Sequence, residues 1–104
     1  MKTIDESFIR ASEMMKALGH PVRIKILSLL GGKRILKMSV KQIQESLGLT
    51  QPQTSRHLIV MKNCSVLSQE KEGYNSYYFI NDEYELIRCL AISINKCMES
   101  NPNK

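Results

Sequence analysis

The sequence from Ser39 to Leu58 is SVKQIQESLGLTQPQTSRHL, and it contains the pattern that decides the fold. Two capping boxes, Ser39 with Gln42 and Thr50 with Gln53, indicate two helix starts, because each pair satisfies amides that a first helical turn leaves free. A short glycine-containing turn separates the two segments. Two short helices joined by such a turn predict a helix-turn-helix.

The second helix of this unit should run from about Gln51 to Asn63. Pro52 is compatible with that start, because a proline is tolerated in a first helical turn.

Further helices are expected before the helix-turn-helix. One preceding helix is expected to be capped by a box at Thr3-Ile4-Asp5-Glu6 and to end at Gly19; the next begins at Pro21, is strongly apolar, and stops at Gly31-Gly32. In the basic connection that follows, Ile35-Leu36 is a candidate for a short edge strand.

A β-hairpin and a last helix are expected after the unit. The hairpin strands lie within Ser65 to Lys71 and Asn75 to Ile80, around a turn at Glu72 to Asn75. Asn81 is expected to cap a helix that runs to about Glu99. The sequence therefore predicts a mainly α fold of the α+β type, with about five helices and one β-hairpin.

Length and composition limit the class of protein. The 104 residues suit a single domain, 1–104, and leave no room for a separate cofactor domain. No apolar run approaches the roughly 18 residues of a membrane span, and the first ten residues are charged where a signal peptide needs an apolar stretch. Three widely spaced cysteines neither form a disulfide framework nor offer a CxxC pair. We expect a cytoplasmic protein with reduced thiols and no contact with membranes.

Positive charge is concentrated in the centre of the chain. Residues 22–63 carry eight Lys or Arg side chains and one acid, whereas residues 1–21 are neutral and residues 64–104 carry a net charge of −2. Such a distribution indicates a surface that attracts a polyanion, although a basic face that is merely solvated would look the same.

Two motifs resemble the ArsR/SmtB family of bacterial winged-helix repressors: the segment His20-Pro21-Val22-Arg23-Ile24-Lys25-Ile26-Leu27, and Thr50 to Leu58 followed by a hairpin containing Tyr77-Tyr78. The resemblance covers roughly Ser12 to Met98. It implies a winged helix-turn-helix that binds double-stranded DNA as a homodimer. One departure lies after the helix-turn-helix, where the family usually turns on glycine and this chain offers Asn63 or Ser65.

A helical wheel from Gln51 to Asn63 separates an inner stripe of Thr54, Leu58 and Met61 from an outer stripe of Gln53, Arg56, Val60 and Asn63. Gln53 and Arg56 are the best candidates for contacting bases, since Gln pairs with adenine and Arg with guanine in the major groove. The resemblance adds Thr50, Gln51 and Ser55 as phosphate or base contacts. The alternative is that these polar side chains only solvate a surface helix.

Basic residues around this helix are expected to contact phosphates. Lys41 and Lys62 should add affinity without sequence discrimination. The hairpin tip, Glu70-Lys71-Glu72, is acidic, so we expect only shallow backbone contacts from Lys71 and Asn75. Solvation is the favoured role of Lys33, Arg34 and Lys37, and His57 is expected to be packed or to act as a cap.

The metal sites of the family are expected to be absent. The expected helix after Ser39 has no Cys or His for a soft-metal site, and the positions that match the family's zinc ligands are Asp82, Tyr84, Asn95 and Met98. Ser28 occupies the second-helix position of the family's thiol sensors, so the usual cysteine pair is incomplete. Pairing of Cys97 with another subunit stays open, although we favour buried, structural roles for Cys64, Cys89 and Cys97. We therefore expect no metal and no cofactor, and the sequence names no inducer.

The first and last helices are expected to form a dimer face, because the last helix carries more apolar surface than one small domain can bury. The residues assigned to it are Phe8, Met15, Leu86, Leu90, Ile94 and Cys97.

The favoured function is that of a homodimeric transcriptional regulator, a repressor by resemblance, which binds an inverted-repeat operator. The alternative is a winged-helix protein-interaction module without specific DNA binding, for which the acidic hairpin is the best argument. No catalytic triad, carboxylate pair or phosphate-binding loop rises above chance, so we do not expect an enzyme.

Overall fold

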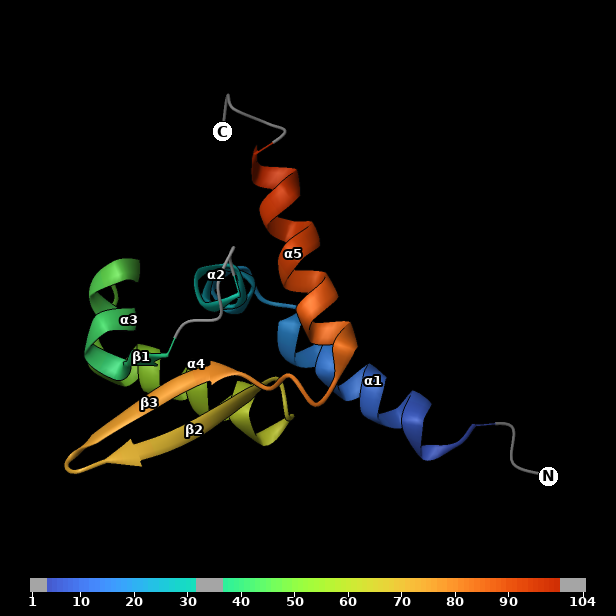
Figure 1. Cartoon of the computed structure of the whole chain (residues 1–104), viewed down its shortest axis with the longest axis horizontal. Helices are drawn as coiled ribbons and strands as arrows, with labels where there is room; N and C mark the ends of the chain where they lie inside the picture. Colours follow the sequence, from blue (N-terminus) through green and yellow to red (C-terminus); the bar gives the residue numbers. More distant parts are fainter. Residues whose placement is uncertain (1–3, 32–36, 100–104) are drawn as a thin grey trace.

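The computed structural model describes residues 4–31 and 37–99. Within these ranges the elements are α1 (Glu6–Leu18), α2 (Pro21–Leu30), β1 (Met38–Ser39), α3 (Val40–Leu47), α4 (Gln51–Asn63), β2 (Leu67–Glu72), β3 (Asn75–Ile80) and α5 (Glu85–Glu99). The strands form one antiparallel sheet in the order β1-β3-β2. Figure 1 shows α3 and the hairpin tip at one side of the molecule, while α1 and α5 extend away from them.

Both capping boxes of the helix-turn-helix are confirmed. The Ser39 side chain accepts from the amide of Gln42, and the Gln42 side chain accepts from the amide of Ser39. Thr50 and Gln53 make the same reciprocal pair at the start of α4. Helix α4 therefore has the expected bounds, because the signals that set them are local.

The starts of the terminal helices differ from expectation. Asp5, and not a residue at position 3, caps α1, because its carboxylate accepts from the amide of Ser7 at 2.9 Å. The hydrogen bonds from the Ser7 side chain and amide lower the pKa of Asp5. Thr3 itself lies outside the described residues. Helix α5 begins at Glu85, four residues after Asn81, because Asn81 accepts from the amide of Glu83 in a tight turn.

Asn81 also determines the corner after α4. Its side-chain amide donates to the carbonyl of Ser65 at 3.0 Å, which ties the start of the last segment to that corner. Ser65 has a φ of 64°, the left-handed conformation usually taken by glycine. The chain therefore turns on Ser65 and not on Asn63.

The candidate edge strand at Ile35-Leu36 lies outside the described residues. A two-residue strand is instead present just beyond it, where Met38 and Ser39 pair with Tyr78 and Tyr77. This pairing places the start of α3 beside the middle of β3.

The core lies where α2, α4 and α5 meet the base of the hairpin. Its fully buried side chains include Ile26, Leu27, Leu30, Ile43, Leu58, Met61, Val66 and Ile87. Gly31 permits the close approach of α5 to the end of α2, because a Cβ there would lie 2.3 Å from Ile80 Cδ1 and 2.5 Å from Ala91 Cβ. The position of α5 is thus set by direct packing against the end of α2.

Candidate nucleic-acid interface

Helices α3 and α4 are joined by a turn of fixed geometry. Gly48 has a φ of 70°, where a side chain would be strained, and the amides of Gly48 and Leu49 both donate to the carbonyl of Gln44, at 2.9 and 3.3 Å. Ile43 of α3 and Leu58 of α4 are fully buried behind this turn. The angle between the two helices is therefore set by the chain's own contacts.

Helix α4 has one buried and one exposed face, as the wheel predicts, except that Val60 of the expected outer stripe is half-buried and packs against the core. Thr54, Leu58 and Met61 are fully buried, and the Thr54 hydroxyl donates to the carbonyl of Thr50 at 2.9 Å. Gln53 and Arg56 are exposed on the opposite side. Within the described residues Arg56 makes no hydrogen bond or ion pair, so all its guanidinium donors are available to a ligand.

Gln53 is exposed but its side-chain oxygen is already engaged. Gln53 Oε1 accepts from the amide and from the hydroxyl of Thr50, both at 3.0 Å. Bidentate pairing with adenine requires that oxygen as well as the amide nitrogen. Contact of Gln53 with adenine would therefore require the capping box to open, so the two roles expected of Gln53 from the sequence exclude each other in this conformation.

Gln51 and Ser55 form a second pair on the first turns of α4. Gln51 Nε2 donates to Ser55 Oγ at 3.0 Å, and Gln51 is exposed while Ser55 is half-buried. The bond leaves the Gln51 side-chain oxygen available as an acceptor. Thr50, Gln51 and Ser55 thus surround the start of α4, but the hydroxyl of Thr50 is used by the cap.

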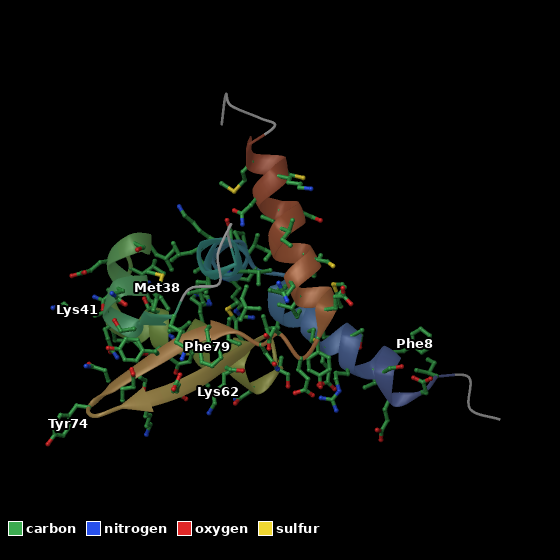
Figure 2. The ribbon with its side chains drawn as sticks, in the orientation of Figure 1. Phe8, Met38, Lys41, Lys62, Tyr74 and Phe79 are labelled. Carbon is green, nitrogen blue, oxygen red and sulfur yellow. The ribbon has the colours of Figure 1, made fainter. Side chains whose placement is uncertain are left out.

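An open hollow of about 660 Å³ lies between α3, the start of α4 and the hairpin tip. It brings together three of the predicted DNA-contacting residues, Lys41, Gln51 and Asn75, from three different elements. Tyr74 and Tyr77 also line it and were not selected from the sequence. Tyr74 is fully exposed at the hairpin tip, and Figure 2 shows it and Lys41 toward the same side of the molecule. A tyrosine directly after the turn glycine was the signal that could have found it.

The other predicted contacts lie outside this hollow. Lys62 is exposed near the end of α4, and Figure 2 shows it well away from Lys41 and the hairpin tip. Lys71 is exposed on β2, across from Ser76 of β3. The predicted set is therefore spread from the hairpin to the far end of α4.

Lys37 is paired and not simply solvated. Its ammonium group forms an ion pair with Glu70 and lies 5.2 Å from the centre of the Phe79 ring. The bond to Glu70 raises the pKa of Lys37. The pair cancels one of the two acids at the hairpin tip, so the hairpin is less acidic than its sequence indicates. Lys33 and Arg34 lie outside the described residues.

The positions that match the family's sensor sites bond to each other. Ser28 Oγ donates to Asn95 Oδ1 at 2.6 Å, and Asn95 Nδ2 donates to the carbonyls of Ser28 and Ala91 at 3.3 and 3.0 Å. Residues 4–31 and 37–99 contain no group of three or more His, Cys, Asp or Glu side chains placed to hold a metal ion. The expectation that the chain carries no metal or cofactor stays a prediction.

The expected burial of the cysteines is wrong for two of the three. Cys89 and Cys97 are exposed on α5, and only Cys64 is partly buried. The physical reason is the orientation of α5, which directs Ile87 and Ala91 into the core and leaves both thiols on other faces.

The predicted dimer face is apolar and largely uncovered. Phe8 is 65% exposed and points away from the rest of the molecule (Figure 2), and Met15, Leu86 and Cys97 are also exposed. Leu90 and Ile94 are partly buried because they pack against the core.

Among the described residues, no helix is long and apolar enough to cross a membrane.

Comparison with known proteins identifies the family. Residues 20–68 match the model of the bacterial regulatory proteins of the arsR family. The chain is 36% identical over 83 residues to an HTH-type transcriptional regulator of Methanocaldococcus jannaschii, which covers 79% of this chain and 91% of the relative.

Solved structures show the same fold. The transcriptional repressor PagR of Bacillus anthracis matches with a TM-score of 0.68 and 32% identity, over 81% of this chain and 95% of PagR. A homodimeric winged helix-turn-helix DNA-binding domain from Mycobacterium bovis matches with a TM-score of 0.73 and 21% identity, over 97% of this chain and 92% of that one. The expected winged helix-turn-helix is confirmed, and the chain is a transcriptional regulator, not an enzyme, that belongs to the arsR family.

Proposed function

We propose that this protein is a transcriptional repressor that binds an inverted-repeat operator as a homodimer, with α4 in the major groove. The proposal rests on the fact that α4 has one buried face and one exposed polar face. Its apolar face is fully buried against the core, while Arg56 is exposed on the opposite face with no partner among the described residues. A guanidinium presented in this way suits bidentate pairing with guanine.

The charge of the chain supports the same assignment. The helix-turn-helix lies within the segment of residues 22–63, which carries a net charge of +7. Lys41, Gln51 and Asn75 line one hollow beside the start of α4, where a nucleic acid backbone would contact them. We assign Lys41, Lys62, Lys71 and Asn75 to backbone contacts, and Arg56 to base contact.

The uncovered apolar side chains of α1 and α5 support a homodimer. Phe8, Met15, Leu86 and Cys97 are exposed there, and a second copy of the chain would cover them. The Mycobacterium bovis domain of similar fold is homodimeric. Two α4 helices related by a two-fold axis would enter successive major grooves about 34 Å apart.

The direction of regulation and the location follow from relatives and from the partner. Bacillus anthracis PagR and Bacillus subtilis SdpR, which are 37% and 34% identical to this chain over 71 and 70 residues, are both transcriptional repressors. DNA binding by this chain would place it in the cytoplasm, where a bacterial or archaeal chromosome lies.

The proposal is tested by selecting DNA from a random pool with the purified protein and titrating the selected sequence with variants. Arg56→Ala should weaken binding by about 1–3 kcal/mol and relax the preference at one base pair of each half-site. Lys62→Ala is the control, since loss of a phosphate contact weakens all sequences to a similar degree and leaves the preference unchanged.

Salt dependence separates DNA binding from a protein-interaction module. Affinity for the selected DNA should fall steeply as salt rises, because phosphate contacts release counterions. Failure to enrich any sequence, or an unchanged preference in Arg56→Ala, would overturn the assignment of α4.

A further inference from the structure

Three residues join the recognition helix to the first two helices. His20 lies in the turn between α1 and α2, Arg23 lies on the first turns of α2, and His57 lies on the flank of α4, directly after Arg56. All three are half-buried. The rings of His20 and His57 have centroids 4.6 Å apart and are inclined by 57°.

Arg23 links α4 to the end of α1. Its Nε donates to Nδ1 of His57 at 3.2 Å, and its Nη1 donates to the carbonyl of Ala17 at 3.2 Å. One guanidinium therefore holds the flank of α4 against the last turn of α1. A lysine could not reproduce this arrangement, because it lacks the planar fork that spans both acceptors.

Both imidazoles are fixed as acceptors at the same ring nitrogen. Nδ1 of His20 accepts from the amide of Val22 at 3.1 Å and so caps α2, while Nδ1 of His57 accepts from Arg23. Neither partner can reverse the bond, since a backbone amide and a guanidinium are donors only. Each neutral ring must therefore carry its proton on Nε2.

A second proton on the His57 ring would have to bind at Nδ1. There it would face an N–H donor, and the hydrogen bond would be lost. The new charge on His57 would also lie beside His20, Arg23 and Arg56, the groups whose charges act on it. Burial, and then these three neighbours, lower the pKa of His57.

This arrangement also argues against a metal site at the two histidines. A ring that accepts at Nδ1 has Nε2 protonated, so Nε2 offers no lone pair to a metal ion. Binding a metal would require both rings to give up their present bonds.

We propose that Arg23 and His57, supported by His20, position the recognition helix for DNA binding, and that protonation of His57 releases the helix and weakens operator binding. The inference rests on the proposed function of α4. The three residues are positioning residues, because none of them needs to contact DNA. These two histidines are the only ones in the chain.

The sign of the pH effect follows from the lowered pKa of His57. Below its ordinary value of 6.5, the unfolded chain binds a proton that the folded chain resists. The neutral His57 ring therefore contributes its full share to the free energy of unfolding above pH 6.5. This contribution is lost as the pH falls from 6.5 toward the lower pKa of His57 in the folded chain. A pH change from about 7.5 to about 5.5 spans the start of this loss.

The test compares the parent with His57→Asn in binding of the selected DNA, followed by fluorescence anisotropy at constant ionic strength. Asparagine offers a side-chain oxygen near the position of Nδ1 and does not titrate. The parent should bind several-fold more weakly at about pH 5.5 than at about pH 7.5, because only the neutral His57 ring accepts from Arg23. His57→Asn should lose less affinity over the same range. Lys62→Ala is the matched control, because it removes an exposed phosphate contact and leaves the cluster intact; it should bind more weakly at every pH but lose the same factor of affinity with acid as the parent.

Denaturant unfolding over the same pH range keeps the test independent of DNA. If the parent binds no DNA at about pH 7.5, the proposed function fails, but a parent that loses stability with acid more steeply than His57→Asn still supports the positioning cluster. Parallel pH profiles of parent and His57→Asn, in both binding and unfolding, would overturn it. A rise in affinity on acidification that depends on His57 would overturn it too, since that is the result expected if the protonated ring simply attracted phosphate.

Discussion

The helix-turn-helix and the terminal helices α1 and α5 differ in how they treat their apolar side chains. Ile43, Leu58 and Met61 of the helix-turn-helix are fully buried, whereas Phe8 of α1 and Met98 of α5 are 65% and 62% exposed. The first region completes its own core and, apart from Ile59, presents mainly polar groups outward. The second leaves apolar surface uncovered. The helix-turn-helix of the isolated chain therefore suits a polar ligand, whereas α1 and α5 suit an apolar partner.

The largest effect is expected inside the core of the helix-turn-helix. Leu58→Ala should lower the free energy of unfolding by about 2–5 kcal/mol, because it removes a fully buried side chain and leaves a cavity. Its neighbour Ile59 is 51% exposed, so Ile59→Ala should cost well under half as much. Urea unfolding of the two variants measures the difference. Equal losses would mean that α4 packs in another orientation.

The next effect is expected at the uncovered end. Phe8→Glu should prevent dimer formation while leaving the chain folded, since an unpaired carboxylate in an apolar interface costs several kcal/mol. Sedimentation should show a dissociation constant raised by about 100-fold or more, with an unchanged circular dichroism spectrum. Tyr74→Glu, at the fully exposed hairpin tip, is the control and should stay dimeric. A dimeric Phe8→Glu protein would place the interface elsewhere.

The same contrast explains which features could be predicted from the sequence. The bounds of α4 follow from Thr50 and Gln53, which interact with each other across three residues. The inner stripe of α4 follows from helical spacing alone, and Thr54 is buried as that spacing predicts. Local signals were sufficient here because neighbouring segments do not compete for the same groups.

The features that were wrong depend on distant contacts. The sequence predicts that Asn81 caps α5, but its Oδ1 accepts from the amide of Glu83 in a turn before the helix, while its Nδ2 donates to the carbonyl of Ser65, sixteen residues earlier. The exposure of Cys89 and Cys97 depends on how α5 docks against the end of α2, where Ala91 approaches Gly31 and Asn95 donates to the Gly31 carbonyl. No periodicity shows which of several apolar stripes of a helix will face the core, because that choice is made by tertiary packing.

The smallest effect concerns Gln53, where the two functions of the helix-turn-helix compete. Gln53→Ala should lower the free energy of unfolding by about 0.5–1 kcal/mol, because it removes one half of the capping box. Gln53→Glu should retain the stability of the parent, since glutamate completes the same box. Denaturant unfolding of the two variants separates the cap from any contact with DNA.

DNA selection with the same variants completes the argument. Because the Gln53 oxygen is held by Thr50, we expect neither variant to change the preferred base at any position, although the added negative charge of Gln53→Glu should weaken all sequences alike. Loss of an adenine preference in both variants would show that the box opens on DNA and that Gln53 contacts a base. The Thr50–Gln53 capping box would then exist only in the free protein. The polar face of the helix-turn-helix would change its hydrogen bonds on binding DNA, whereas its buried face would stay as it is.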